Sequence, residues 1–386
     1  MQKHIRAVFM RGGTSKALMF RQADLPLDRA DWAPIFLSAM GSPDPNGRQL
    51  DGMGGGISSL SKVCVIGAPS HPDADVDFTF AQIGVGDSVV DYAGNCGNMS
   101  SAVGPFAIEE GMLPRPADGP VSVRIHNTNT RKIIVATFEV RGGRAVVEGD
   151  CAIDGVAGTG APIRLDFVDP GGAKTGRTLP SGKPVDLLTP AIGAPIEATL
   201  VDAANPCVFV RASDLGLTGT ELPDSLDANK DLLKRLEAIR QAGSVAMGLT
   251  SDLKAAADMQ SIPKVALVAA PAAAPTLSGR QLRASEIDLL VRMISVGQPH
   301  KAVPITGGLC LGVACRIPGS LPESVLGARA SNALRIGHPS GILLVDALVE
   351  QREPGVTAGV SSGVVARHAS VFRTARRLFQ GEVLFR

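Results

Sequence analysis

One cysteine stands in a turn of glycine and asparagine, directly before a run of small residues. Residues 94–98 read GNCGN and residues 99–103 read MSSAV. This pattern predicts a turn that delivers Cys96 to the first turn of a buried helix, where free backbone N–H groups meet the positive end of the helix dipole. Such a position binds carboxylates and favours the thiolate form of a cysteine. Most cysteines are small buried hydrophobes, but glycine and asparagine are poor core residues, so we expect a functional Cys96 at an accessible helix start.

A lysine stands at the mouth of an apolar strand. It is Lys62, in the segment GGGISSLSKVCVIG at residues 54–67. A glycine-rich loop with three serines and a lysine suits anion binding. The alternative is an ordinary solvated lysine at a strand end, but the uncharged neighbours indicate a pocket. A lysine that is removed from water can lose its proton near neutral pH and act as a base.

The segment MRGGTSKALMF at residues 10–20 offers a third set of polar groups. Arg11 can clamp a carboxylate with two parallel N–H groups, and Thr14 and Ser15 supply hydroxyls beside a glycine turn. The segment lacks the G-x-x-x-x-G-K-[ST] order of a phosphate-binding loop, and no G-x-G-x-x-G opens a helix after a strand. These patterns argue against nucleotide binding.

Weaker candidates lie in the second half of the chain. Asn205, before Pro206, can place an amide in the site, although a plain turn explains it equally well. Lys301 and residues 306–308 (TGG) precede a second small-residue segment and can form a second anion site, and residues 337–341 (GHPSG) resemble a cap at another helix start. No two of the six histidines have metal-ligand spacing, and no G-x-S-x-G elbow of a serine hydrolase occurs.

Composition limits the class of protein. The 386 residues, 45% hydrophobic and 19% charged, are enough for two domains with substantial cores. The net charge of +1 and the 4% of aromatic residues argue against nucleic acid and an anionic membrane as partners. No run of about 18 apolar residues predicts a membrane span. The N-terminus lacks the apolar core of a signal peptide, and the six cysteines form no C-x-x-C pair, so we expect reduced thiols and a cytoplasmic location.

Strand patterns dominate the chain. Alternating apolar residues predict strands near 76–83, 89–92, 121–125, 133–137, 145–147 and 363–385. Helical patterns predict helices over 28–40, 226–242, 285–295 and 324–336, with Gly41 and Gly243 ending the first two. Two further helices, at about 97–110 and 307–317, are rich in small residues on every face, which indicates that other structure encloses them.

These elements predict an α+β fold of two similar lobes, each a curved, mostly antiparallel sheet wrapped around a central helix. We expect the N-terminal lobe over residues 1–185, around the helix at about 97–110, with a strand near 376–386 returning to it. We expect the C-terminal lobe over residues 186–375, around the helix at about 307–317.

Taken together, these motifs resemble the family of 2-methylaconitate cis–trans isomerases, 3-methylitaconate delta-isomerases and 4-oxalomesaconate tautomerases. The resemblance rests on residues 10–20, 54–67, 90–111 (VDYAGNCGNMSSAVGPFAIEEG), 205–206 and 337–341, which span nearly the whole chain. Ala17 departs from the glycine expected in most members. The resemblance implies a diaminopimelate-epimerase-like fold with the active site in the cleft between the lobes, and no cofactor.

The resemblance also assigns residues to roles. By motif match, Lys62 corresponds to the family's catalytic lysine and Cys96 to the cysteine at the start of the central helix. The second lobe has Gly307 and Gly308 near the matching position, with Cys310 displaced into the helix, which argues against the two-thiol mechanism of diaminopimelate epimerases. The expected catalytic residues are Lys62 and Cys96, with no metal ligands, and the expected substrate-binding residues are Arg11, Thr14, Ser15, Ser58, Asn95, Gly97, Asn98, Asn205, Lys301, Thr306, Gly307, His338, Ser340 and Gly341.

The predicted activity is a cofactor-independent allylic proton shift in a small unsaturated di- or tricarboxylate such as 2-methylaconitate, 3-methylitaconate or 4-oxalomesaconate. Lys62 would move the proton, and the loop hydroxyls and helix N–H groups would stabilise the dienolate. The sequence does not distinguish a double-bond shift from a cis–trans change. It also leaves open whether Cys96 is catalytic or only binds substrate, and whether the chain forms a homodimer or a homotetramer. The alternatives are an amino-acid racemase or epimerase of the same fold and a non-catalytic carboxylate-binding protein.

Overall fold

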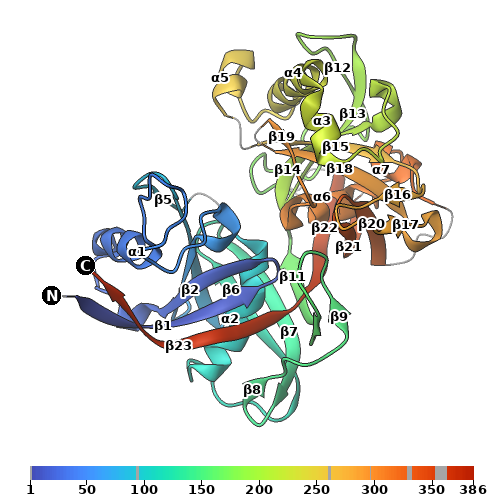
Figure 1. The fold of residues 1–386 in the computed structure, drawn as a ribbon. Helices are drawn as coiled ribbons and strands as arrows, with labels where there is room; N and C mark the ends of the chain where they lie inside the picture. Colours follow the sequence, from blue (N-terminus) through green and yellow to red (C-terminus); the bar gives the residue numbers. More distant parts are fainter. Residues whose placement is uncertain (1, 93–94, 260–261, 296, 328–332, 353–362) are drawn as a thin grey trace. The chain divides into compact units, whose positions relative to one another are not determined.

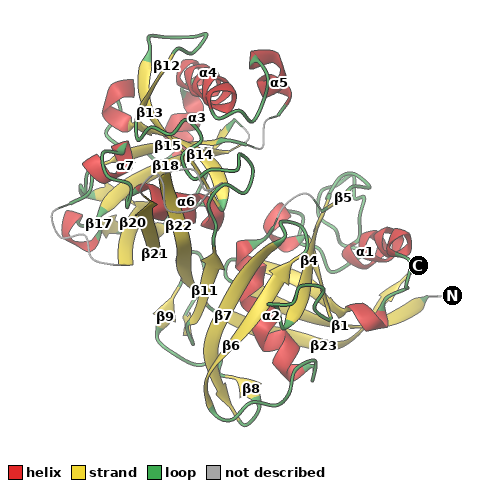
Figure 2. Cartoon of the chain, turned by 180° about the vertical axis from the view of Figure 1, so that it is seen from behind, coloured by secondary structure: helices red, strands yellow, loops and turns green. Residues whose placement is uncertain are grey.

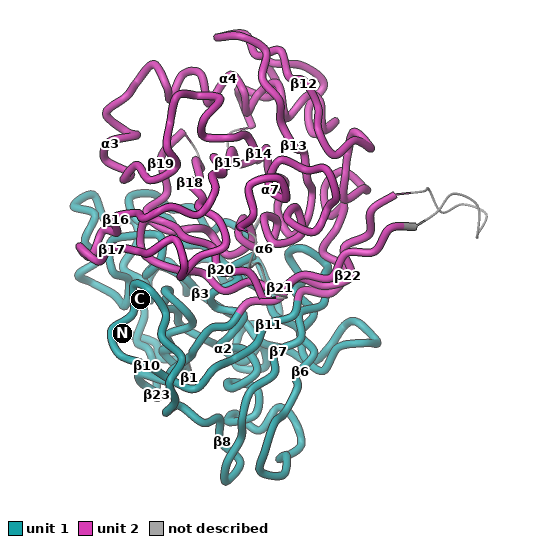
Figure 3. The backbone as a smooth tube through the Cα atoms, turned by 90° about the vertical axis from the view of Figure 1, so that its right-hand side faces the viewer, with its two compact units in different colours: residues 1–166, 372–386 teal, residues 167–371 magenta. Residues whose placement is uncertain are grey.

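The computed structural model describes residues 2–92, 95–259, 262–295, 297–327, 333–352 and 363–386. The chain forms two compact units, residues 1–166 with 372–386 (unit 1) and residues 167–371 (unit 2), which Figure 3 draws in different colours. Unit 2 begins before the expected boundary at residue 185, because Gly172 N–H donates to the backbone oxygen of Asp202, deep in that unit, at 2.8 Å. The expected turn before Cys96 includes residue 94, which lies outside the described residues.

The sheet of unit 1 has the strand order β23–β1–β2–β3–β4–β6–β7. Figure 1 shows β1 between β2 and β23. Neighbouring strands are antiparallel, except that β2–β3 and β4–β6 are parallel. The short strands β5 and β8 pair with β4 and β7. The bounds are β1 Lys3–Gly12, β2 Ser15–Arg21, β3 Lys62–Gly67, β4 Val76–Ile83, β5 Val90–Asp91, β6 Gly119–Asn127, β7 Lys132–Arg141, β8 Arg144–Ala145 and β23 Ala375–Phe385.

One helix lies inside this sheet and another covers its outer face. The strands of unit 1 surround α2 (Gly97–Glu109), as Figure 2 shows from behind. A Cβ on Gly104 would stand 2.6 Å from the Phe138 ring of β7, so the small residues let the strands approach the helix. On the other face, α1 (Trp32–Met40) ends at Gly41, as predicted, and stacks Phe36 on Phe20 of β2. Because β3 is covered on both faces, all six of its residues are buried.

Unit 2 repeats this architecture. Its sheet has the order β12–β13–β14–β15–β18–β20–β21–β22, with β14–β15 and β18–β20 parallel and the other neighbours antiparallel. The central helix is α6 (Ile305–Ala314), which contacts β13, β14 and β21. The bounds are β12 Asp186–Leu188, β13 Ile196–Ala203, β14 Asn205–Arg211, β15 Lys264–Ala269, β18 Leu289–Ser295, β19 Gln298–Pro299, β20 Ala333–His338, β21 Gly341–Arg352 and β22 Gly363–Arg373.

The predicted helix over 226–242 is displaced in the structure. Its outer helix, α4, spans Lys230–Ala246 and is capped by Asn229, whose side chain accepts from Leu232 N–H at 3.0 Å. Leu226 belongs to the separate helix α3 (Pro223–Ala228). Gly243 does not end α4, because it serves close packing instead: a Cβ there would stand 2.4 Å from Val208 of β14.

Two other predicted helices are wrong. Within 285–295 the structure has β18, a buried strand between β15 and β20. A continuous apolar run cannot distinguish a strand that is covered on both faces from a buried helix. The predicted helix over 324–336 contains residues 328–332, which lie outside the described residues, and it ends in β20.

The remaining elements are short. They are β9 Cys151–Ala152, β10 Thr159–Gly160, β11 Ile163–Val168, β16 Ala274–Pro275, β17 Gln281–Leu282, α5 Leu253–Asp258, α7 Leu321–Ser324 and the 3-10 turns at Gln22–Asp24, Arg29–Asp31, Ser58–Leu60, Ala212–Leu215 and Ala284–Glu286. None of the helices among the described residues is long and apolar enough to cross a membrane.

Candidate active site

The turn between β1 and β2 packs against the first turn of α2. A Cβ on Gly12 would stand 2.7 Å from the backbone oxygen of Asn98, and one on Gly13 would stand 2.1 Å from Asn98 Oδ1. Gly13 also has a φ of +50°, a conformation that side chains with a Cβ avoid. Both glycines are therefore required for the predicted glycine turn to reach the helix N-terminus.

Asn98 joins the turn to the helix through its side-chain amide. Its Oδ1 accepts from Thr14 N–H and from Arg373 Nε, each at 3.3 Å, and its Nδ2 donates to Thr14 Oγ1 at 3.1 Å. Arg373 is 7% exposed, and burial lowers its pKa to about 10. The predicted binding residues Thr14 and Asn98 are thus brought together, and a buried guanidinium fixes them.

Cys96 is the N-cap residue of α2, and its side chain makes no capping hydrogen bond. Its backbone oxygen accepts from Ser100 N–H at 3.0 Å, the first bond of the helix. Gly97 and Asn98 follow as the first helical residues, so the half-buried Cys96 stands beside first-turn N–H groups that have no partner within the helix. This is the position that the sequence predicts for the thiol.

Lys62 is the first residue of β3 and is 7% exposed. Its Nζ donates to Gln82 Oε1 of β4 at 2.5 Å and lies 5.0 Å from the centre of the Phe80 ring. Gln82 is itself fixed, because its Nε2 donates to the backbone oxygens of Ser61 at 2.9 Å and of Ser58 at 3.1 Å. Among the described residues, no carboxylate forms an ion pair with Lys62. The amine is therefore buried against a neutral amide and an aromatic ring.

Lys62 and Cys96 both influence the pKa of one buried thiol, that of Cys64. Residues two apart on a strand share a face, so Cys64 follows Lys62 on the same face of β3. Burial raises the pKa of Cys64 far above its ordinary value, the nearby Cys96 raises it further, and Lys62 opposes the rise. Because α2 contacts β3, the structure brings the two predicted catalytic residues to one region of unit 1.

The segment before α2 is held by two asparagines, one at the last residue of β6 and one just after that strand. Asn127 Nδ2 donates to Asn95 Oδ1 at 3.2 Å, and Asn129 Nδ2 donates to the backbone oxygen of Tyr92 at 2.7 Å. The amide of Asn95 therefore has a protein partner, and its predicted contact with substrate stays a prediction. Asn127 and Asn129 thus anchor the chain at Asn95 and at Tyr92, shortly before Cys96.

Three other predicted binding residues of unit 1 differ in their surroundings. Ser15 is buried at the start of β2, opposite Gly12. Ser58 is exposed in the loop before β3. Arg11 donates to the backbone oxygens of Gly13 at 2.9 Å and Thr374 at 3.0 Å, so it braces the turn. The carboxylate clamp predicted for Arg11 stays a prediction, and these contacts would compete with it.

The candidates of unit 2 fall into two groups. Ser340 Oγ donates to the backbone oxygen of Lys301 at 2.6 Å and Ser340 N–H donates to His338 Nδ1 at 3.2 Å, so these residues gather at the β20–β21 turn with Gly341. This turn joins two strands and opens no helix, which corrects the expected helix cap. The second group is Asn205, at the start of β14, with Thr306 and Gly307 in the first turn of α6, a helix that contacts β14.

Sequence reasoning missed the residues that hold the site together. Gln82 lies opposite Lys62 on β4, and the predicted strand over 76–83 gave the only signal for it. The sequence NTNT at 127–130 signals a polar turn, but not its contact with residues 92–95. Arg373 lies 275 residues from Asn98, and no local pattern links them.

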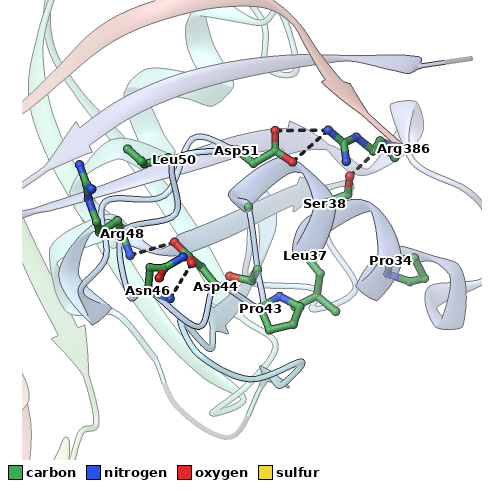
Figure 4. A pocket seen from close by; sticks show the side chains of 12 residues that line it. Pro34, Leu37, Ser38, Pro43, Asp44, Asn46, Arg48, Leu50, Asp51 and Arg386 are labelled. Carbon is green, nitrogen blue, oxygen red and sulfur yellow. Dashed lines mark hydrogen bonds and ion pairs between the residues drawn. The ribbon is translucent and has the colours of Figure 1, made fainter.

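Two other features of unit 1 do not match the predicted chemistry. A cavity of about 790 Å³ lies beside α1, and its lining includes Asp44 and the ion pair of Asp51 with Arg386 (Figure 4). None of the predicted site residues lines it.

The side chains of Ser70, Asp77 and His126 lie in contact with one another. The serine and the aspartate both contact His126 Nδ1, so the ring cannot relay a proton between them.

No group of three or more histidine, cysteine, aspartate or glutamate side chains among the described ranges is arranged to hold a metal ion.

Comparison with known proteins identifies the chain's relatives. A family model described as PrpF protein matches residues 2–386. The 3-methylitaconate isomerase of Eubacterium barkeri is 42% identical over 385 residues, which cover 99% of this chain and 97% of that protein. The 2-methyl-aconitate isomerase of Shewanella oneidensis is 38% identical (96% and 95% covered), and the (4E)-oxalomesaconate Delta-isomerase of Novosphingobium sp. is 39% identical (97% and 96% covered).

Solved structures agree with the fold. A crystal structure of methylitaconate-delta-isomerase matches with a TM-score of 0.87 at 42% identity, covering 100% of this chain and 96% of that chain. A hydroxyproline epimerase from Agrobacterium vitis matches with a TM-score of 0.50 at 11% identity, covering 100% and 94%. The second likeness concerns the fold alone, and it confirms the predicted two-lobed architecture of racemases and epimerases.

Proposed function

Because this chain belongs to the PrpF protein family, we propose that it is an isomerase that moves a proton along the allylic system of a small unsaturated di- or tricarboxylate. The observation that carries the proposal is the placement of Lys62, at the start of β3, and Cys96, at the N-terminus of α2, in one region of unit 1, where α2 contacts β3. A base, a thiol and anion-binding N–H groups are the parts that this reaction needs.

Lys62 is proposed as the base that removes the allylic proton. An amine accepts a proton only in its neutral form, and a carboxylate partner would hold it as ammonium. Its partner is instead the neutral amide of Gln82, and only 7% of the residue is exposed. The contacts of Gln82 with the chain at Ser58 and Ser61 keep the amide oxygen pointed at Lys62. These contacts fix the position of the amine without an ion pair.

Proton removal leaves a dienolate, whose negative charge spreads into a carboxylate. The first-turn N–H groups of α2 and the positive end of its dipole suit that charge. The Asn98–Thr14–Arg373 contacts fix these groups before substrate arrives. A donor that is already placed where charge develops contributes roughly 3 kcal/mol to the transition state.

Cys96 is proposed as the partner acid, which gives a proton to the other carbon of the allylic system while Lys62 keeps the proton that it took. Proton exchange with solvent then restores the thiol and the neutral amine. Its side chain makes no capping bond with the helix, so the thiol can face the substrate. The dienolate has a partly single central bond, which allows either a shifted double bond or a cis–trans product. All six cysteines are free, which fits the reducing cytoplasm that we propose as the location.

The test is proton NMR in deuterated water with 2-methylaconitate, 3-methylitaconate, 4-oxalomesaconate and aconitate. We expect at least one acid to be converted into its isomer, with solvent deuterium appearing at the carbon that receives the proton. Absence of both conversion and deuterium uptake with all four acids would refute the proposal. Exchange at the α-carbon of proline or hydroxyproline instead would favour a racemase or epimerase.

A further inference from the structure

Two arginines face each other at one end of the β1–β23 pair. Arg11 and Arg376 are opposite residues of this antiparallel ladder, so their side chains share one face of the sheet. Like charges in this arrangement repel each other. In the part of the chain that the structure describes, neither guanidinium forms an ion pair with a carboxylate. The two residues (the arginine pair) therefore leave a positive charge without a counter-charge.

The arginine pair lies on the face of the sheet that α2 does not cover. Gly12 points toward α2, because a Cβ there would stand 2.7 Å from the backbone oxygen of Asn98. Neighbouring residues of a strand point to opposite faces, so Arg11 points away from α2. Phe9 shares this outer face and belongs to the core cluster that includes residues of α1. The arginine pair is thus separate from Cys96 and the N-terminus of α2.

Residues 147–160 pack against this outer face and form a cavity of about 360 Å³ with the arginine pair. The segment contains the hairpin β9–β10, and a Cβ on Gly160 would stand 3.3 Å from Thr374 Cβ, directly before β23. Opposite the guanidinium groups, the lining includes Val147, Ile153 and Val156, of which Val147 is 43% exposed. The cavity therefore combines charged and apolar walls, as sites for small organic ligands do.

Arg11 keeps two N–H groups for a ligand. Its Nη1 donates to the backbone oxygens of Gly13 and Thr374, and its Nη2 donates to Thr374 Oγ1 at 2.9 Å. Because a guanidinium has five N–H groups, the Nε–H and one N–H of Nη2 remain. These two lie on one edge of the planar group, where they match the two oxygens of a carboxylate. The contacts that brace the β1–β2 turn thus also hold this edge in a fixed orientation.

The charges around the cavity favour an anion. Burial and the charge of Arg376 both lower the pKa of Arg11 from 12.5, but a guanidinium stays charged at neutral pH. Glu148 is the only acid among the described residues that line the cavity, and it is exposed. Cys151 also lines the cavity, and burial raises the pKa of its thiol, which Arg373 opposes. Two positive charges against one exposed carboxylate leave the cavity positive.

We propose that this cavity binds a small organic carboxylate. Its charged group bridges the arginine pair, and its carbon chain lies against Val147, Ile153 and Val156. An inorganic anion would leave the apolar wall in water, and an uncharged molecule would leave the guanidinium groups without a counter-charge. Because Arg11 braces the β1–β2 turn, the ligand also stabilises the turn that holds Asn98. This binding site does not depend on the proposed isomerase function.

The experiment measures binding by isothermal titration with pentanoate. Pentanamide and inorganic phosphate are the comparisons without the charge and without the carbon chain. The variants are Arg376→Met and Arg376→Lys, because Arg376 is exposed, and thermal unfolding verifies that they fold as the wild type does. Arg141→Met is the matched control, since Arg141 is an exposed arginine of the same unit that does not line the cavity. Alkylation of Cys151 and Cys96 by iodoacetamide, followed by peptide mass spectrometry, locates the ligand.

We expect pentanoate to bind the wild type and to slow the alkylation of Cys151. Arg376→Met should raise Kd about tenfold, as the loss of a charge-assisted hydrogen bond requires. Arg376→Lys should recover part of the affinity, and Arg141→Met should bind like the wild type. The proposal is overturned by a wild type that does not bind pentanoate, by an unchanged Kd in folded Arg376→Met, or by protection of Cys96 without protection of Cys151. Equally tight binding of pentanamide or phosphate would show that the ligand class is wrong.

Discussion

Replacing Gly13 with alanine tests whether the β1–β2 turn fixes the N-terminus of α2. The new Cβ would stand 2.1 Å from Asn98 Oδ1 and 3.0 Å from Arg373 Cδ. No ordinary contact is that short, so Asn98 must move and lose its bonds with Thr14 and Arg373. The positive φ of +50° adds backbone strain.

The chain offers a matched control in Gly142, which stands in the turn between β7 and β8. Its φ is +59°, but a Cβ there meets nothing within 4 Å. Alanine at either position costs about 1 kcal/mol of left-handed strain. Only Gly13→Ala also loses hydrogen bonds, two between neutral groups and one to a guanidinium. Two of the three bonds are long, so their loss together should lower the free energy of unfolding by about 3 kcal/mol. We therefore expect the free energy of unfolding to fall by about 4 kcal/mol in Gly13→Ala and by about 1 kcal/mol in Gly142→Ala.

The assay is chemical denaturation followed by tryptophan fluorescence. Trp32 is the single tryptophan of the chain and is buried in unit 1, which also contains both glycines, so the signal reports on the relevant unit. Isomerase activity should fall at least tenfold in Gly13→Ala and stay unchanged in Gly142→Ala. Equal unfolding free energies for the two variants would refute the inference that Asn98 is held by this turn.

Two further outcomes follow from single contacts. Gln82→Glu places a carboxylate against Lys62 and ties the amine into an ion pair, so kcat should fall about tenfold or more, whereas turnover like that of the wild type would contradict the base assignment. The N–H of Arg283, together with other donors, lowers the pKa of Glu286 from 4.5 to about 2. Because the folded pKa is the lower one, this carboxylate stabilises the fold above pH 4.5 and loses that effect as the pH falls towards 2. Glu286→Gln should therefore unfold with a weaker pH dependence over this range by circular dichroism, and an unchanged dependence would contradict it.

Local patterns predicted much of the fold and the position of the main site residues. Cys96 at the start of α2 follows from glycine, asparagine and small residues that are neighbours in the chain. Lys62 at the start of β3 follows from an apolar run after a polar loop. These predictions succeed because capping and strand signals are carried by adjacent residues.

The contacts that prepare these residues for chemistry could not be predicted. Gln82 faces Lys62 because of strand register, and Arg373 reaches Asn98 because the C-terminal strand returns to β1. Register and strand order depend on packing across the whole unit. The helix predicted over 285–295 fails for a related reason, since burial on both faces removes the alternation that identifies a strand.

The most direct test of the central claim follows the substrate's allylic hydrogen with and without Lys62. Proton NMR in deuterated water measures the rate of exchange at that carbon for the wild type, Lys62→Ala and the control Lys3→Ala, an exposed lysine of the same sheet. The account predicts that Lys62→Ala keeps its thermal stability and its affinity for propane-1,2,3-tricarboxylate, an analogue with no double bond to move. The same variant should lose exchange at least 100-fold, while Lys3→Ala exchanges like the wild type. An exchange rate in Lys62→Ala equal to that of the wild type would contradict the account.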